Sequence, residues 1–354
     1  MDTQREGEHV VQVDRFPVQP FKDKNFSLNF YRQMMRARVL DERLIKMVKS
    51  GQGHFWIGGP GEEAFSTSLG MLVDKGEGLE HDYLHLHYRN NSVVMAMGMP
   101  MVEFIRQMAS KQSDIFSGGR NFSGHCAYRP WNVVPVTSTI ETQFSVAPGT
   151  AMAQLTNREE GKKSGVTIVV GGDAGSAEAD FATAMIWASR PGKELPLLMI
   201  VTNNGWGIST AAETQHGEKH VHERAKPFGI KTAMVDGLQA DKVWAAISKA
   251  LEYVRETGKP FMLECMVSRM YGHSSSSGAN LVEGEACPID IFEKKLLKSQ
   301  WLDAEEIKKI RAELEEECNE AHEKVLTEEL PTADSIYEYS FADKNEGGIP
   351  GRDF

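Results

Sequence analysis

The sequence has few cysteines, no long hydrophobic run and no excess of positive charge, and each absence excludes a class of protein. Its four cysteines among 354 residues lie far apart and form no C-x-x-C pair, which indicates reduced thiols rather than a disulfide framework or a zinc site. No stretch approaches the roughly 18 apolar residues of a membrane span. The formal net charge of −11 argues against nucleic acid as the main partner, because phosphate backbones require basic patches.

The first residues also lack the features of a targeting segment. The stretch MDTQREGEHVVQVDRF has neither an apolar signal core nor the arginine-rich, acid-poor character of a transit peptide, so we expect a cytoplasmic protein. Hydrophobic residues make up 41% and charged residues 25%, as in soluble globular proteins. We expect one domain over residues 27–300, an N-terminal arm over 1–26, and a helix with a polar tail over 301–354.

The segment 166–210 predicts a β-α-β unit whose strands both end in polar residues. Residues 166–170 and 197–201 are short apolar runs rich in β-branched side chains, typical of parallel strands covered on both faces. Asp173 follows the first run and Asn203–Asn204 follows the second. Because open α/β sheets bind ligands at the carboxyl ends of their strands, we expect these side chains to lie together at a binding site.

The chemistry of this strand edge favours a metal ion and a phosphate. Carboxylate and carboxamide oxygens are hard ligands that suit Mg²⁺ or Ca²⁺. We expect a helix after Gly175, whose free N–H groups and positive dipole end would face the same edge and bind phosphate.

Hydrophobic periodicity extends the alternation of strands and helices, so the sequence predicts an α/β fold with a largely parallel sheet and helices on both faces. Glycine-rich segments at 51–64 and 118–131 are expected to be loops. The elements we expect elsewhere are helices over 28–49 with Ser27 as N-cap, over 100–112, over 240–255 and after Asp303 with Glu306 completing a capping box, and strands over 234–237 and 261–267.

Gly172-Asp173-Ala174, followed by Asn204 thirty-one positions after Asp173, resembles the Gly-Asp-Gly…Asn-Asn signature of thiamine diphosphate enzymes. The wider segments GGDAGSAEADF and TNNGWGIST are similar to the alpha subunit of the decarboxylating component of 2-oxo acid dehydrogenase complexes. That similarity extends, with gaps, over about residues 30–325. It implies a thiamine diphosphate-binding fold for the predicted sheet.

The resemblance also implies the residues that hold the cofactor. Asp173, Asn204 and the Trp206 carbonyl would bind Mg²⁺, and the active-site histidine would be His273. Tyr88 and Arg89 correspond to a Tyr-Arg pair that holds the diphosphate, a role suited to the bidentate guanidinium. The implied cofactor-binding residues are Tyr88, Arg89, Ser138, Ile140, Gly172, Asp173, Ala174, Gly175, Asn204, Arg224 and His273.

The glycine-rich loop at 51–64 contains large apolar side chains that require burial, either in packing or against a substrate. The resemblance makes Phe55, Trp56, Ile57 and His125 the substrate pocket. Pyruvate-type members have histidine at the position of Ile57, whereas branched-chain-type members have an apolar residue there. The branched-chain type is therefore favoured over the pyruvate type.

The resemblance implies a reaction and two protein partners. The diphosphate-binding signature occurs once, and no second half resembles a pyrimidine-binding domain, so a beta subunit would supply the required glutamate in an α₂β₂ assembly. The reaction would be decarboxylation of a 2-oxo acid and transfer of the acyl group to a lipoyl group of an acyltransferase component. His273, near its ordinary pKa, would assist proton movement.

Two other functions remain open. His85 and His87 would share one face of a strand and could bind zinc with a third ligand, and the segment HGEKHVH at 216–222 could form a second cluster, although it reads first as a solvated loop. Such clusters would suit a metal-dependent hydrolase. A cofactor-binding subunit without dehydrogenase activity would explain the departures from the family pattern, which are Ala174, Asn90, Asn91, Ser277 and Gly278.

Overall fold

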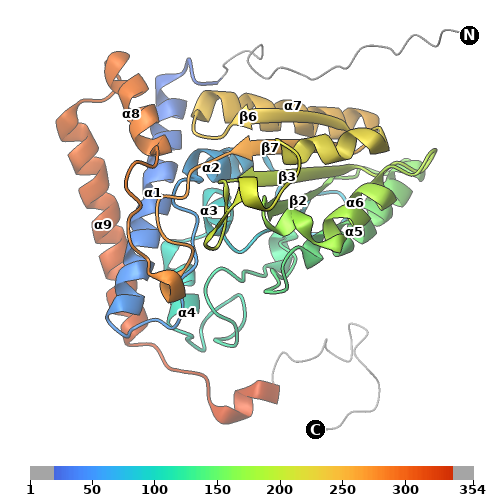
Figure 1. Cartoon of the computed structure of the whole chain (residues 1–354). Helices are drawn as coiled ribbons and strands as arrows, with labels where there is room; N and C mark the ends of the chain where they lie inside the picture. The colour runs from blue at the N-terminus through green and yellow to red at the C-terminus, as the bar shows by residue number, and fades with distance from the viewer. Residues whose placement is uncertain (1–19, 338–354) are drawn as a thin grey trace, which may run out of the picture.

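The computed structural model describes residues 20–337 (Figure 1). Most of the predicted N-terminal arm, up to residue 19, and the tail from Phe341 lie outside the described residues. The division of the chain at residues 26 and 300 remains a prediction.

A five-stranded parallel sheet forms the centre of the described chain, which confirms the predicted α/β fold. Its strands in sequence order are β1 (Tyr83–His85), β2 (Thr167–Gly172), β3 (Leu197–Asn203), β6 (Lys231–Asp236) and β7 (Phe261–Met266). Their order across the sheet is β1-β2-β3-β7-β6, and every neighbouring pair is parallel. A short antiparallel ribbon, β4 (Trp206–Gly207) and β5 (Thr210–Ala211), follows β3.

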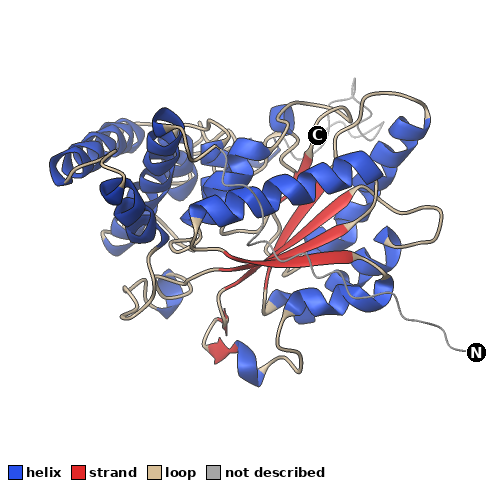
Figure 2. Ribbon diagram, turned by 90° about the horizontal axis from the view of Figure 1, so that it is seen from above, coloured by secondary structure: helices blue, strands red, loops and turns tan. Residues whose placement is uncertain are grey.

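Helices cover both faces of the sheet (Figure 2). The α-helices are α1 (Lys24–Lys49), α2 (Glu63–Leu72), α3 (Asn91–Ala96), α4 (Met101–Met108), α5 (Thr142–Glu159), α6 (Ala179–Ala188), α7 (Ala240–Thr257), α8 (Pro288–Lys298) and α9 (Ala304–Leu326). The 3₁₀-helices are η2 (Arg129–Trp131), η3 (Gly175–Ala177), η4 (Ala212–Thr214), η5 (Val221–Phe228), η6 (Ser275–Ser277) and η7 (Ala333–Tyr337).

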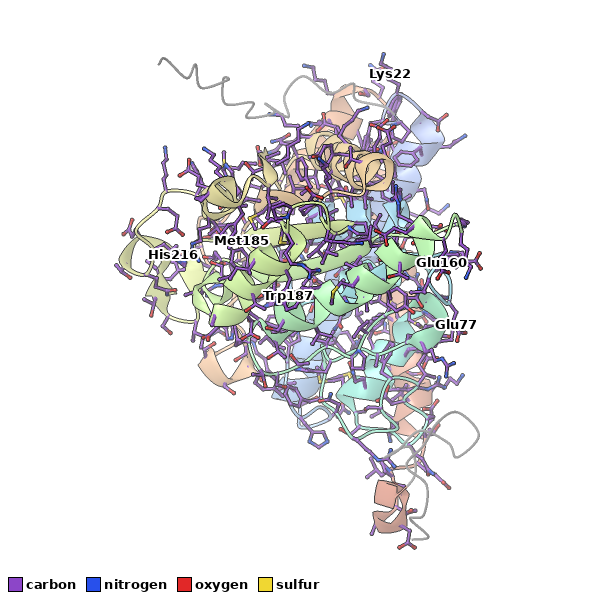
Figure 3. The ribbon with its side chains drawn as sticks, turned by 90° about the vertical axis from the view of Figure 1, so that its right-hand side faces the viewer. Lys22, Glu77, Glu160, Met185, Trp187 and His216 are labelled. Carbon is purple, nitrogen blue, oxygen red and sulfur yellow. The ribbon has the colours of Figure 1, made fainter. Side chains whose placement is uncertain are left out.

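The alternation of side chains along β2 divides the core into two layers. Ile168 and Val170 belong to a large apolar cluster that includes residues of α1, α2 and α7, whereas Val169 belongs to a second cluster with residues of α5 and α6. On α6, Met185 packs into this second cluster while Trp187 is exposed on the outer surface (Figure 3). Both faces of β2 and β3 are therefore buried, as the apolar runs predicted.

Helices from the two ends of the described chain pack against each other beside the sheet, where α1 lies against α8 and α9 (Figure 1). The Arg32–Glu313 and Arg36–Glu317 ion pairs join α1 to α9. The capping box that the sequence predicts for α9 is present, because the Asp303 side chain accepts from the Glu306 backbone N–H and Glu306 accepts from that of Asp303.

Three predicted helix boundaries were wrong. α1 begins four residues early and is capped by Asp23, which accepts from the Phe26 backbone N–H at 2.7 Å, whereas Ser27 is buried and donates to the Phe21 carbonyl. The helix expected over 100–112 ends at Met108. The residues after Gly175 form the short η3, and α6 starts only at Ala179.

All four cysteines are free thiols, as predicted. Among the helices of residues 20–337, none is both long and apolar enough to cross a membrane.

Candidate functional site

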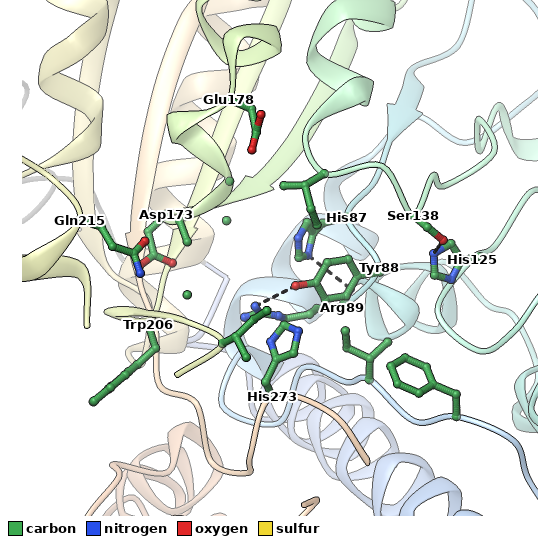
Figure 4. A pocket seen from close by; sticks show the side chains of 18 of the residues that line it. His87, Tyr88, Arg89, His125, Ser138, Asp173, Glu178, Trp206, Gln215 and His273 are labelled. Carbon is green, nitrogen blue, oxygen red and sulfur yellow. Dashed lines mark hydrogen bonds between the residues drawn. The ribbon is translucent and has the colours of Figure 1, made fainter. Parts of the chain in front are cut away.

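A cavity of about 370 Å³ opens at the carboxyl ends of β1 and β2 (Figure 4). Segments far apart in the sequence form its wall, because the loops that follow parallel strands meet at one edge of the sheet. Its lining residues are Phe55, Ile57, His87, Tyr88, Arg89, Phe122, His125, Ser138, Ile140, Gly172, Asp173, Ala174, Gly175, Glu178, Trp206, Gly207, Ile208, Gln215 and His273.

Asp173 and Asn204 follow neighbouring strands, as predicted. β2 and β3 are in register with Gly172 opposite Thr202, which brings the two polar residues to the same edge. Asp173 is only 1% exposed, and within the described chain its Oδ2 has no hydrogen-bond partner. Burial raises the pKa of this carboxyl while the Arg89 guanidinium opposes the rise. A buried carboxylate oxygen without a partner is costly, so this edge fits a bound cation.

Asn204 follows β3 but is not among the residues that line the cavity. Its Oδ1 accepts a hydrogen bond from the Trp206 backbone N–H at 3.0 Å, which fixes the tight turn after β3. Its Nδ2 is buried and has no partner among the residues described here. Trp206, which the turn presents, lines the cavity, and the Arg269 guanidinium lies 5.5 Å from the centre of its ring.

Glu141 packs against the turn after β2. The sequence did not predict this contact. Its Oε1 accepts from the Gly172 backbone N–H at 3.0 Å, and a Cβ at Gly171 or Gly175 would overlap its carboxyl group. Burial raises the pKa of Glu141 to about 8. Two glycines are therefore required because a carboxyl side chain fills the space where their side chains would lie.

Tyr88 and Arg89 form a buried polar pair in the loop after β1. Arg89 donates to the Tyr88 hydroxyl at 3.1 Å, and its guanidinium lies 3.7 Å from the buried Glu62 carboxylate. Both residues line the cavity, and the guanidinium remains charged at any working pH. This pair therefore gives the cavity a fixed positive charge suited to an anion.

His85 and His87 do not form the metal pair that one interpretation required. β1 ends at His85, whose Nε2 contacts the Thr150 hydroxyl at 2.9 Å, whereas His87 lies beyond the strand and its ring stacks on Tyr88 with centroids 3.7 Å apart. Over residues 20–337 there is no group of three or more His, Cys, Asp or Glu side chains that could hold a metal ion.

The histidine-rich segment at 216–222 is held by internal contacts and is only partly solvated. His222 is buried, and its Nδ1 lies 2.7 Å from the Glu264 carboxylate. His216 contacts the Arg224 guanidinium at 2.9 Å. Arg224 also donates to the carbonyl of Ser176, so it braces the turn after Asp173 without lining the cavity.

One wall of the cavity is apolar. Phe55 and Phe122 make an edge-to-face contact with ring centroids 5.4 Å apart, and Ile57 and Ile140 line the same cavity. Ile140 is 42% exposed, so it does not belong to the apolar core. His125 lies at this wall, with its Nε2 2.8 Å from the Ser138 hydroxyl.

Trp56 was predicted to line the substrate pocket, and this was wrong. Its side chain is fully buried in the core, and its indole N–H donates to Asp41 at 2.8 Å. Ile57 forms an antiparallel bridge with Ser274. Because neighbouring side chains of an extended segment point to opposite sides, Phe55 and Ile57 face the cavity while Trp56 faces α1.

His273 lies on the loop after β7 and lines the cavity next to Tyr88, with ring centroids 6.0 Å apart. Burial, with the nearby positive charges of Arg89 and Arg269, lowers the pKa of His273 to about 4. The expectation that this imidazole titrates near its ordinary pKa was wrong, and it is neutral at pH 7. Its buried Nδ1 has no hydrogen-bond partner in the part of the chain that the structure describes.

The predicted site residues converge on this cavity except for Trp56, Asn204 and Arg224. Five lining residues were not predicted: Phe122, Glu178, Gly207, Ile208 and Gln215. Glu178, Gly207 and Ile208 lie in the segments that resemble the family, but the resemblance gives them no role. The sequence offers His87 only as a zinc ligand.

Known proteins provide an independent comparison. The sequence profile of the family described as "Dehydrogenase E1 component" matches residues 31–334. The 2-oxoisovalerate dehydrogenase subunit alpha of Bacillus subtilis is 30% identical over 258 residues, which cover 73% of this chain and 75% of that protein.

Two further relatives extend the match. The pyruvate dehydrogenase E1 component subunit alpha of Porphyra purpurea is 25% identical over 338 residues, covering 90% of this chain and 94% of the relative. The mitochondrial 2-oxoisovalerate dehydrogenase subunit alpha 1 of Arabidopsis thaliana is 25% identical over 316 residues. These residues cover 87% of this chain but 64% of the Arabidopsis protein, so the chain spans less than two thirds of that relative.

Proposed function

Since the chain belongs to the Dehydrogenase E1 component family, we propose that it is the alpha subunit of a thiamine diphosphate-dependent decarboxylating component of a 2-oxo acid dehydrogenase complex. The observation that carries this proposal is the pairing of opposite charges across one cavity. At one side lies a buried carboxylate oxygen of Asp173 that has no partner within the described chain, and at the other lies the Tyr88–Arg89 pair. A magnesium diphosphate has both the cation and the anion that these groups require.

The residues present fit this cofactor. Asp173, Asn204 and the Trp206 carbonyl would hold Mg²⁺, while Tyr88 and Arg89 would bind the phosphates together with the backbone of Ala174 and Gly175. Ser138, Ile140 and Gly172 would contact the organic part of the cofactor, and Arg224 would support the phosphate turn through Ser176. The partly exposed apolar side chain of Ile140 is suited to packing against a ring.

Bound thiamine diphosphate would supply the electron sink for loss of CO₂ from a 2-oxo acid. The chain would contribute the surroundings of that reaction. The apolar wall would exclude water from the reacting carbon, and Arg89 would hold the anion in place. The neutral His273, whose Nδ1 has no partner among residues 20–337, would accept or donate a proton during acyl transfer to a lipoyl group.

We assign the substrate to the branched-chain 2-oxo acids, with Phe55, Ile57 and His125 in the substrate pocket. Several relatives are named for 2-oxoisovalerate, a branched acid, although one is named for pyruvate. The apolar contact between Phe55 and Phe122, with Ile57 beside it in the wall, supports a branched acyl chain.

The partners would be a beta subunit, in an α₂β₂ assembly, and the lipoyl-bearing acyltransferase component. Ile140, Trp206 and Ile208 are large apolar side chains that line the cavity and are still exposed in the single chain. Their exposure supports a second subunit that covers the cofactor. We also propose that the protein is cytoplasmic, as its sequence predicts.

Four of the five departures from the family pattern have structural explanations, which favours an active subunit over a degenerate one. Ala174 has φ −64°, a conformation that any residue adopts, so no glycine is required there. Asn90 accepts from the His87 backbone N–H, and Asn91 accepts from the Cys126 thiol. The Ser277 hydroxyl accepts from the Ser274 backbone N–H and caps η6.

The test is reconstitution of the chain with a beta-type subunit. We expect magnesium-dependent binding of thiamine diphosphate by calorimetry, and turnover of a branched 2-oxo acid when the acyltransferase component is present. Binding without turnover of any 2-oxo acid would favour the degenerate cofactor-binding subunit. Absence of binding, with stoichiometric zinc in the purified protein, would favour the hydrolase.

A further inference from the structure

His87 is a buried cavity residue for which the sequence offers only the rejected zinc site and the family comparison gives no role. It lies directly before the Tyr88–Arg89 pair, and its ring is stacked on the Tyr88 ring with the planes inclined by 39°. The Asn90 side chain accepts from the His87 backbone N–H at 2.9 Å, which fixes the main chain at this residue. Both the ring and the backbone of His87 therefore have a defined position.

The contacts of the ring determine where its proton lies. Nδ1 of His87 accepts a hydrogen bond from the Arg89 backbone N–H at 3.4 Å, so the proton of a neutral imidazole is on Nε2. Burial, with the positive charge of Arg89, lowers the pKa of His87 well below its ordinary value. The ring is therefore a neutral donor through Nε2 at physiological pH.

Nε2 faces the turn that carries Asp173. A Cβ at Gly172 would lie 3.9 Å from this nitrogen, which places Nε2 close to the backbone just before the carboxylate of Asp173, the proposed metal ligand. His87 thus presents an N–H group to the same cavity as Arg89, which would bind the phosphates, and Asp173, which would bind their metal ion (Figure 4).

We propose that His87 donates a hydrogen bond from Nε2 to a phosphate oxygen of the bound diphosphate. This inference rests on the proposed function, because it assumes that the cavity binds thiamine diphosphate. A neutral donor adds a directional contact without adding a further positive charge beside the Arg89 guanidinium.

The variants that test this inference distinguish a hydrogen bond donated from the position of Nε2 from one donated from the position of Nδ1. His87→Gln can place an amide N–H near the position of Nε2, whereas His87→Asn reaches only the position of Nδ1, and His87→Phe keeps the stacking on Tyr88 without any donor. Each variant is purified as the full chain with its beta-type subunit. Calorimetry in excess Mg²⁺ measures the affinity for thiamine diphosphate and, in parallel, for thiamine, which has no phosphate.

We expect His87→Phe and His87→Asn to weaken thiamine diphosphate binding about tenfold or more, the effect of one hydrogen bond to a charged acceptor. Thiamine binding should change much less, and His87→Gln should recover most of the lost affinity. His85→Gln is the matched control, since His85 is a buried histidine two residues away whose Nε2 contacts Thr150 outside the cavity. It should leave the affinity for thiamine diphosphate unchanged.

Three results would overturn the inference: unchanged affinity in His87→Phe, equal weakening of thiamine and thiamine diphosphate, or a His87→Gln variant as weak as His87→Phe. Thermal unfolding of every variant identifies a loss of affinity caused by misfolding, and the Gln and Asn variants remain informative if the Phe variant does not fold. If the unmodified protein does not bind thiamine diphosphate, the proposed function fails first, so the two failures are distinguishable.

Discussion

Trp56 and Ser275 lie 219 positions apart and exchange two hydrogen bonds. The Trp56 backbone N–H donates to the Ser275 hydroxyl at 3.1 Å, and the Ser275 backbone N–H donates to the Trp56 carbonyl at 2.8 Å. Ile57, in the apolar wall, follows Trp56, and His273 lies two residues before Ser275. This pair of hydrogen bonds therefore fixes the apolar wall of the cavity relative to His273, the proposed catalytic histidine.

We expect Trp56→Phe to destabilise the chain. The indole N–H is the hydrogen-bond donor to the buried Asp41 carboxyl, and removing it leaves a buried polar group without that partner. The expected loss is about 1–3 kcal/mol in the free energy of unfolding, measured by urea denaturation. Trp187→Phe is the control, because Trp187 is exposed and its replacement should change stability by less than about 0.5 kcal/mol. Equal effects of the two substitutions would contradict this role of Trp56.

Asp173→Asn should abolish tight binding of magnesium thiamine diphosphate without unfolding the protein. The carboxamide keeps the shape of the carboxyl but removes the charge that holds the cation, and breaking a buried charge pair typically costs about 3–5 kcal/mol. Calorimetry with the beta subunit present measures this loss. Asp180→Asn, a change seven residues later and outside the cavity, should leave affinity unaltered. Unchanged affinity in Asp173→Asn would exclude the assigned metal site.

The purified chain alone should be inactive toward every 2-oxo acid. The family resemblance requires a glutamate from a second subunit to activate the cofactor, and the cavity of the single chain leaves Ile140 and Trp206 exposed. Activity should appear on titration with the beta subunit and saturate at one beta chain for each alpha chain. Turnover of a 2-oxo acid by the single chain would show that the beta subunit is not required to activate the cofactor.

The polar end of the sheet was predictable because its pattern is local. Asp173 and Asn204 each follow a short apolar run, and adjacent parallel strands bring such positions to one edge whatever the rest of the fold. The α9 capping box was predictable for the same reason, since Asp303 and Glu306 are three residues apart.

Other features depend on contacts between distant segments and were not predictable. The direction of the Trp56 side chain depends on where the extended segment begins and on the distant Asp41. The low pKa of His273 results from burial, from Arg89 in a distant loop and from Arg269 in its own loop. Glu141, in a left-handed conformation with φ 61°, supports glycines thirty residues later, and its sequence context gives no sign of this role.

His273→Ala should slow acylation of a lipoyl acceptor more than it slows decarboxylation followed with an artificial electron acceptor. The imidazole lines the cavity and is neutral at pH 7, so it can exchange a proton during acyl transfer, a step that the artificial acceptor bypasses. The expected loss is about 10²-fold or more for the lipoyl reaction, the usual contribution of a general acid–base group. His54→Ala, at an exposed histidine, serves as control. Equal losses in both assays would indicate a binding role for His273.

The identity of the substrate should depend on Ile57. Its side chain is 7% exposed and lines the cavity with Phe55, so it contributes an apolar surface at the position where the family resemblance implies histidine in pyruvate-type members. Each buried methylene contributes about 0.8 kcal/mol, or roughly fourfold in kcat/KM, so we expect the reconstituted enzyme to prefer 3-methyl-2-oxobutanoate and its homologues to pyruvate.

Ile57→His should shift the ratio of the two kcat/KM values toward pyruvate. Ile186→His, on the exposed face of α6, should leave the ratio unchanged. A higher kcat/KM for pyruvate in the unmodified enzyme would overturn the branched-chain assignment, and an unaltered ratio in Ile57→His would remove this residue from the specificity pocket.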